Sequence, residues 1–202
     1  MRVAFGLDGV LADVERALSD LADKVFDPRP ETLSHDQQEL LWRVVLASEN
    51  FWEQLAEIEP GAVARLAAIA SERQWEVIFL VRRAPTVGST PQLQTQNWLV
   101  AHGFELPSVF NVERPPAEIE YALQLDAIVN SPYEHLQEVA GQALVSGTAK
   151  AARDVTRIGS VDEVLRRLCE LDGAPAAPVK KPDWKSWLGF GQHKHPPVTV
   201  RA

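Results

Sequence analysis

Three apolar segments of this sequence each end in polar side chains of the kinds that bind anions or transfer protons. Asp8 follows the apolar run 2–7, Arg82 and Arg83 follow the run 76–81, and Asn130 and Ser131 follow the run 127–129. A carboxylate can act as a general acid or base, and planar guanidinium groups suit the geometry of a phosphate. In open α/β sheets, ligands bind outside the carboxyl ends of the strands. We therefore take these five residues as candidate ligand-binding residues.

Short apolar strands that alternate with helices must position these side chains. The pattern predicts strands at 2–7, 76–81, 109–112, 127–129 and 143–145, and helices at 61–73, 91–102, 116–123, 133–140 and 161–171. Such alternation predicts an α/β fold, with a parallel sheet that has helices on both faces. Ahead of it, residues 14–57 have a helical period that Pro28 and Pro30 interrupt. Ser160 is the expected cap of the last helix.

The chain changes character at Gly173. Residues 174–178 form a Pro-rich linker, which is typically stiff, and a basic, aromatic tail continues to residue 202. Trp184, Trp187 and Phe190 lie among lysines in this tail, and their apolar surface predicts a docking element. It could dock on its own domain, on a partner or on an anionic membrane surface.

Composition excludes several functional classes. The 202 residues carry a net charge of −8, which argues against a nucleic-acid partner because phosphate affinity needs clustered cations. Cys169 is the single cysteine, so no disulfide can form within the chain, which fits a reducing compartment. We expect no transmembrane segment and no signal peptide, because no apolar stretch is long enough to span a bilayer and a strand begins almost at once. These features predict a cytoplasmic protein.

Residues 2–13, with the sequence RVAFGLDGVLAD, resemble the first motif of the haloacid dehalogenase (HAD) phosphatase superfamily. In that family an apolar strand runs into Asp-x-Asp-Gly-Val/Leu-x-x-Asp, where the first Asp is the nucleophile and the second is the general acid/base. Here Gly6 stands at the nucleophile position, and Asp8 stands at the acid/base position. Glycine has no side chain with which to form an aspartyl-phosphate.

The resemblance covers roughly residues 2–170 and is closest to bacterial HAD hydrolases of the 5′-nucleotidase-like group. It implies a three-layer α/β/α Rossmannoid domain, with a small helical cap inserted after the first strand. On this basis residues 1–13 and 58–172 are the HAD-like core, 14–57 the cap, and 173–202 the linker and tail.

The other three family motifs are also altered. The second motif ends its strand in Thr or Ser, where this chain has Val81, and Arg83 keeps the position of the relatives' arginine. The third motif supplies a lysine, and Pro116 occupies that position, with Arg114 two residues earlier as a substitute. The fourth is an acidic pair that holds Mg²⁺, and Asn130 and Ser131 replace it. We therefore expect no bound metal and no cofactor.

Several interpretations of the individual residues stay open at this point. Asp8 is either a residual catalytic group or, as we favour, an acceptor for backbone N–H groups of the turn after the first strand. Arg82 and Arg83 bind a phosphate, pair with Asp8, or pair with acids near Glu53 and Glu57.

We expect a catalytically degenerate HAD-like protein, a pseudophosphatase that binds a protein partner or a small phosphorylated ligand. The alternative is an active phosphatase or nucleotidase with a non-standard nucleophile, for instance Asp8 or water, and this alternative would require Mg²⁺. A third interpretation is a ligand sensor that retains affinity for its substrate through Arg82 and Arg83.

Overall fold

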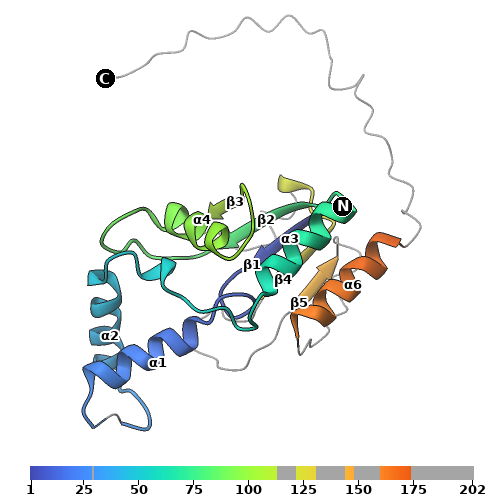
Figure 1. Ribbon diagram of the computed structural model, residues 1–202. Coiled ribbons are helices and arrows are strands. Elements are labelled where there is room, and N and C mark those ends of the chain that lie inside the picture. The colour runs from blue at the N-terminus through green and yellow to red at the C-terminus, as the bar shows by residue number, and fades with distance from the viewer. Residues whose placement is uncertain (29, 113–121, 131–143, 148–159, 174–202) are drawn as a thin grey trace, which may run out of the picture. The chain divides into compact units, whose positions relative to one another are not determined.

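A five-stranded sheet organises the chain in a computed structural model (Figure 1), which describes residues 1–28, 30–112, 122–130, 144–147 and 160–173. The strands are β1 (Arg2–Gly6), β2 (Glu76–Val81), β3 (Ser108–Asn111), β4 (Ala127–Asn130) and β5 (Leu144–Gly147). Their order in the sheet is β3-β2-β1-β4-β5, so the first strand of the sequence lies at the centre. The chain thus has a mixed α/β fold, as the alternating pattern predicts.

Four of the five strands are parallel, and the fifth corrects our prediction. β1 runs parallel to both β2 and β4, and β2 runs parallel to β3. β5 is antiparallel to β4, with Asn130 opposite Leu144. β5 therefore runs back along β4, and an antiparallel pair of strands does not need the crossover connection that joins two parallel strands. The short apolar run at 143–145 predicts a strand but carries no information on its direction.

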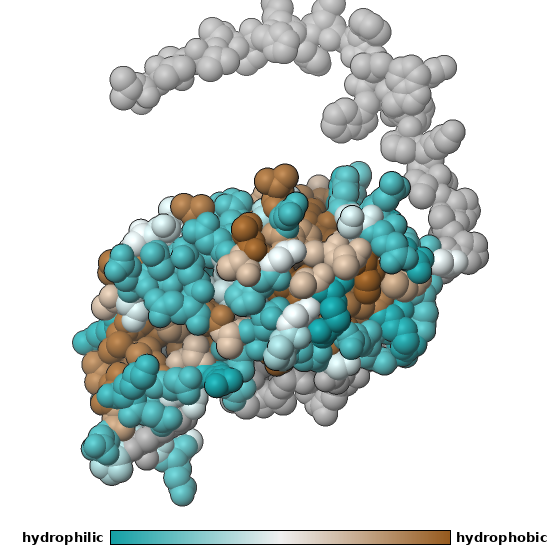
Figure 2. Space-filling view, viewed as in Figure 1, coloured by the Kyte–Doolittle hydropathy of each residue, from teal (hydrophilic) through white to brown (hydrophobic). Residues whose placement is uncertain are grey.

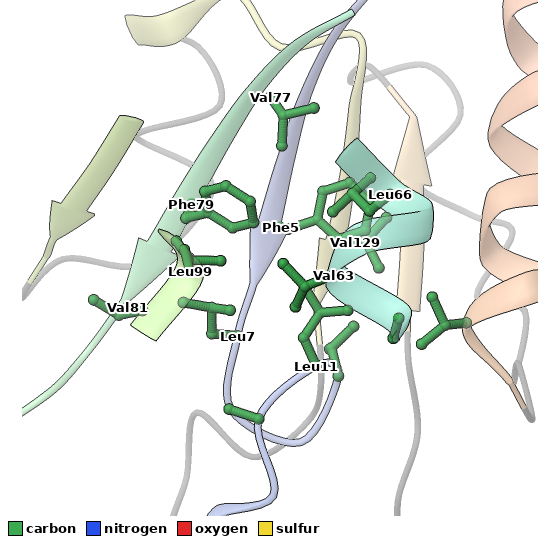
Figure 3. Packing of buried hydrophobic residues seen from close by; sticks show 14 of the residues in the cluster. Phe5, Leu7, Leu11, Val63, Leu66, Val77, Phe79, Val81, Leu99 and Val129 are labelled. Atoms are coloured by element: carbon green, nitrogen blue, oxygen red, sulfur yellow. The ribbon is translucent and has the colours of Figure 1, made fainter. Parts of the chain in front are cut away.

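The two faces of the sheet bury different sets of side chains. Odd-numbered residues of the central strands, including Phe5, Phe79 and Val129, form the larger core together with the helices (Figure 3). Even-numbered residues, including Ala4, Leu80 and Ile128, form a smaller cluster on the other face. This alternation follows from the two-residue period of a strand. The helices that we predict at 116–123 and 133–140 lie outside the described residues except for the end of the first.

Four of the described helices begin at a side-chain cap that the sequence provides. The bounds of the described helices are α1 (Val14–Val25), α2 (His35–Ala47), the short 3₁₀ helix η1 (Phe51–Glu53), α3 (Ala62–Arg73), α4 (Pro91–Ala101) and α6 (Val161–Gly173). Asp13 caps α1 by accepting a hydrogen bond from the Arg16 N–H, and Thr90 caps α4. The Ser160 hydroxyl accepts from the Glu163 N–H at the start of α6, as the sequence predicts.

Helices α1 and α2 and the short helix η1 lie in the predicted cap, 14–57, and we call residues 14–47, which contain α1 and α2, the hairpin. Val45 of α2 belongs to the larger core, and Leu18 and Leu21 of α1 pack against that core. The chain divides into two compact units, Met1–Asp172 and Gly173–Ala202, and nearly all of the second unit lies outside the described residues. Within the described segments, no helix combines the length and the apolar character needed to cross a membrane.

Candidate functional site

The sheet brings Asp8 and Arg83 to the same edge. β1 ends at Gly6, which lies opposite Leu80 of the neighbouring parallel strand β2, and β2 ends one residue later at Val81. Two residues beyond each strand, the Asp8 and Arg83 side chains meet. Parallel neighbours end at the same side of a sheet, so a separation of 75 residues in sequence becomes direct contact.

Asp8 does not cap the turn that follows β1, which corrects our favoured interpretation. The N–H groups of Val10, Leu11 and Ala12 all donate to the Leu7 carbonyl, at 3.1, 2.9 and 2.9 Å, and Gly9 N–H donates to the Ala12 carbonyl. Because main-chain carbonyls satisfy these donors, the Asp8 carboxylate stays available for a side-chain partner. Gly9 itself has a φ of 77°, which a residue with a side chain rarely adopts.

That partner is Arg83, which forms a two-pronged ion pair with Asp8. Arg83 Nη2 lies 2.5 Å from Asp8 Oδ1, and Nε lies 3.2 and 3.3 Å from the two carboxylate oxygens. The Arg83 side chain is fully buried, whereas 26% of the Asp8 side chain is exposed. A buried guanidinium needs a compensating charge, and the carboxylate supplies it with favourable geometry.

Residues from three other elements fix the Arg83 guanidinium and its main chain. Nη1 donates to the Thr95 hydroxyl of α4 at 2.9 Å, and that hydroxyl donates to the Pro91 carbonyl at 2.6 Å. The guanidinium carbon lies 5.0 Å from the centre of the Trp52 ring, a cation–π arrangement. The Asn111 amide accepts from Arg83 N–H and donates to the Arg83 carbonyl, at 3.0 and 2.9 Å. Contacts from α4, η1 and β3 thus fix both the side chain and the main chain of Arg83.

The structure shows how the two arginines pair, while their binding of a phosphate stays a prediction. Arg83 pairs with Asp8, and Arg82 is exposed and has no ion-pair partner among the described residues. Glu53 accepts a hydrogen bond from the Asn97 amide instead, at 2.9 Å. Glu57 accepts from the backbone N–H groups of Gly61 and Val63 at the start of α3. The alternative in which these two glutamates pair with the arginines is wrong.

Sequence reasoning missed three residues of the site: Trp52, Thr95 and Asn111. Asn111 ends β3 just as Asp8 and Arg83 follow β1 and β2, so the rule about carboxyl ends of strands could have found it. Thr95 and Trp52 carry no such signal, because one lies in the middle of a helix and the other in an apolar segment. The sequence predicts Trp52 as packing, and it is 3% exposed.

The remaining candidate residues lie at or beyond the limits of the described chain. Arg114, Pro116 and Ser131 fall outside it, so their predicted roles stay predictions. Asn130 is the last residue of β4, and the structure describes its backbone position alone.

The described residues at this edge do not fit the Mg²⁺ ion that the HAD resemblance implies. Gly6 offers no carboxylate, and the Asp8 carboxylate already faces a guanidinium, which would repel a dication. Val81, at the position of the family hydroxyl, is a buried hydrocarbon. Elsewhere in the described chain, no group of three or more His, Cys, Asp or Glu side chains could hold a metal ion.

Comparison with known proteins identifies no family for this chain. No model of a protein family matches the chain. No curated protein matches it either. The HAD resemblance therefore depends on the motifs quoted above and on their order along the chain.

Proposed function

We propose that this chain is a HAD-like pseudophosphatase that acts by binding a protein partner and not by catalysis. The observation that carries the proposal is the Asp8–Arg83 ion pair. In the HAD interpretation, Asp8 is the residue that must exchange a proton, and here its carboxylate is engaged by a fully buried guanidinium. A general acid or base must reach the proton that it transfers, and Gly6 leaves no nucleophile beside it.

The position of the pair in the fold supports the HAD interpretation. The proposed first motif leaves the central strand, β1, and the proposed second motif leaves the adjacent parallel strand, β2. Both therefore reach the carboxyl ends of strands, where α/β folds bind ligands.

A protein partner is favoured over a small phosphorylated ligand because other side chains already engage the Arg83 guanidinium. A phosphate would have to displace the Asp8 carboxylate and the Thr95 hydroxyl to reach this guanidinium. Arg82 is the exposed arginine, but a single exposed guanidinium makes a weak anion site. The alternative enzyme, with Asp8 as a non-standard nucleophile, would need the same carboxylate to leave Arg83.

The direct experiment measures phosphate release from a generic phosphate ester in the presence of Mg²⁺. We expect no turnover above buffer from the wild-type chain or from Asp8→Asn. Gly6→Asp should also be inactive, because it restores the nucleophile but leaves Val81 and the Asp8–Arg83 pair unchanged. Wild-type turnover that Asp8→Asn abolishes, in protein shown to be folded, would overturn the proposal. Turnover that Asp8→Asn leaves unchanged, and that stays with the protein through a second purification step, would also overturn the proposal, because the alternative enzyme could use water as its nucleophile.

A further inference from the structure

Two side chains of α4 contact the outer edge of β3. β3 is the first strand in the order of the sheet, and β2 is its only neighbour among the described strands. The Gln92 amide donates a hydrogen bond to the Val109 carbonyl at 2.9 Å, and the Gln96 amide donates to the Pro107 carbonyl at 3.4 Å. Both glutamines therefore bind the main chain of an edge strand.

The pairing of β3 with β2 shows which way these carbonyls point. Val112 N–H donates to the Val81 carbonyl of β2, and the backbone groups of successive residues in a strand point alternately to its two sides. Phe110 therefore also turns its backbone groups toward β2, whereas Val109 turns its own away from the sheet. Pro107, two residues before Val109, faces outward as well, and it has no N–H to donate.

The spacing of the two glutamines matches the spacing of the two outward carbonyls. Gln92 and Gln96 are four residues apart on one face of α4, which is a rise of about 6 Å. Pro107 and Val109 are two residues apart, which is a rise of about 6.6 Å along an extended strand. One helix can therefore place an amide against each of the two carbonyls.

The surface around this edge carries apolar side chains that would favour association. Phe110 on β3 is 45% exposed, Leu106 just before the strand is 95% exposed, and Val100 on α4 is 54% exposed. In Figure 2, apolar residues reach the surface in the region where Figure 1 shows α4 and β3. An open edge strand beside apolar side chains is a site at which chains add to one another strand by strand.

We infer that Gln92 and Gln96 close the outer edge of β3 and keep copies of this chain from pairing through it. An added strand needs the Val109 carbonyl as an acceptor, and it would have to displace the Gln92 amide to reach it. Pro107 offers such a strand no donor. The inference goes beyond the proposed function, because it concerns how the chain avoids its own copies and not what it binds.

The test compares the sedimentation of the wild-type chain with that of Gln92→Ala/Gln96→Ala over a range of protein concentrations. The double variant lacks both amides, and we expect its sedimentation coefficient to rise above that of the wild type as the protein is concentrated. Asn97→Ala is the matched control, because it removes an exposed amide of the same helix that binds Glu53 and not β3. It should sediment as the wild type does.

Circular dichroism checks that each variant keeps the wild-type helix content. If the double variant loses helix content, Gln92→Ala alone takes its place in the comparison, because it opens the Val109 carbonyl and leaves the Gln96 contact in place.

Two further measurements locate the association. Val109 N–H points outward like its carbonyl, so its hydrogen exchange should be slower in the associated double variant than in the wild type. Ser108 is an exposed residue of β3, and Ser108→Lys in the double variant adds a charge to the edge strand. This charge should reverse the association, because charged side chains on an edge oppose strand pairing.

The inference is wrong if the double variant sediments as the wild type does at every concentration, or if Asn97→Ala associates equally. It is also wrong if the association leaves the exchange of Val109 unchanged, or if Ser108→Lys does not reduce the association. Any of these results, with phosphate release still undetected, leaves the proposed function standing. Asp8-dependent turnover would overturn the proposed function and would leave this inference untouched.

Discussion

The guanidinium of Arg83 is a permanent positive charge inside the protein, and this fact governs the chemistry of its neighbours. Its side chain has no exposed surface, so the carboxylate of Asp8 is needed to compensate it. Thr95 and Trp52 complete its surroundings. At the residue scale, the site is therefore an ion pair that the surrounding packing holds in place, rather than a set of free acid/base groups.

Removing the charge of Asp8 should destabilise the fold. Asp8→Asn leaves a buried cation without its counter-charge, a change that typically costs about 3–5 kcal/mol. We expect about 3 kcal/mol, because Asp8 is partly exposed. The measurement is the free energy of unfolding in urea.

The control for this variant is Asp13→Asn, which keeps a good N-cap on α1 and should change the stability little. The double variant Asp8→Asn/Arg83→Met should lose less than the sum of the two single losses, by at least about 1 kcal/mol. Losses that simply add would mean that the two side chains do not depend on each other.

A second ion pair, at the opposite end of β1, predicts a pH effect. Arg2 Nε lies 2.5 Å from Glu76 Oε2, and this hydrogen bond, followed by the charge of Arg2, lowers the pKa of Glu76 from its ordinary 4.5. A carboxyl with a lowered pKa stabilises the fold above pH 4.5, and this contribution is lost as the pH falls through the lowered pKa.

Thermal melting as a function of pH checks this effect. Glu76→Gln should melt below the wild type near neutral pH, and the difference should shrink in strong acid. High salt should also reduce the difference, because the glutamate is exposed. A difference that grows as the pH falls would contradict the assignment.

At the scale of elements, the loop after β2 connects the hairpin to the sheet. Asn50 N–H donates to the Val87 carbonyl at 2.8 Å, and Val87 N–H donates to the Leu46 carbonyl at 3.1 Å. The Asn50 side chain accepts from Ser89 N–H at 2.9 Å. These bonds fix the end of α2 beside the loop that carries Arg83. We therefore expect the loop and the hairpin to unfold together.

Gly88 tests this connection. Its φ of +102° strains any other residue, and a Cβ at this position would collide with the Asn50 side chain. Gly88→Ala should lower the free energy of unfolding by about 1–3 kcal/mol, measured in urea. Gly173→Ala, where a Cβ would meet nothing within 4 Å, should stay within about 0.5 kcal/mol of the wild type. Equal stabilities for both variants would show that the loop does not need this conformation.

Elements with a strong local pattern could be predicted, and pairings between distant elements could not. The apolar run 76–81 is β2 to the residue, and Thr90 with Pro91 starts α4 because capping and ring geometry act locally. The direction of β5 depends on how the chain returns from β4, which a short strand does not encode. The Asp8–Arg83 pair depends on the register of β1 and β2, so the sequence left Arg83 with several possible partners.

At the scale of the whole molecule, the described fold places Asp8 and Arg83, from the first two proposed motifs, at the carboxyl ends of β1 and β2, where α/β proteins bind ligands. The central position of β1 brings Asp8 beside Arg83, and the buried guanidinium engages the Asp8 carboxylate. Gly6, two residues before Asp8, has no side chain that could act as a nucleophile. These features support the proposal that the chain binds a partner and does not catalyse a reaction.

The most direct test of this account is a calorimetric titration of the wild-type chain with Mg²⁺ at millimolar concentration. If Arg83 neutralises the Asp8 carboxylate, a dication gains no binding site there, and the titration should show no saturable heat. A saturable heat that disappears in folded Asp8→Asn would contradict the account, because it would mean that Asp8 leaves Arg83 to bind a metal ion.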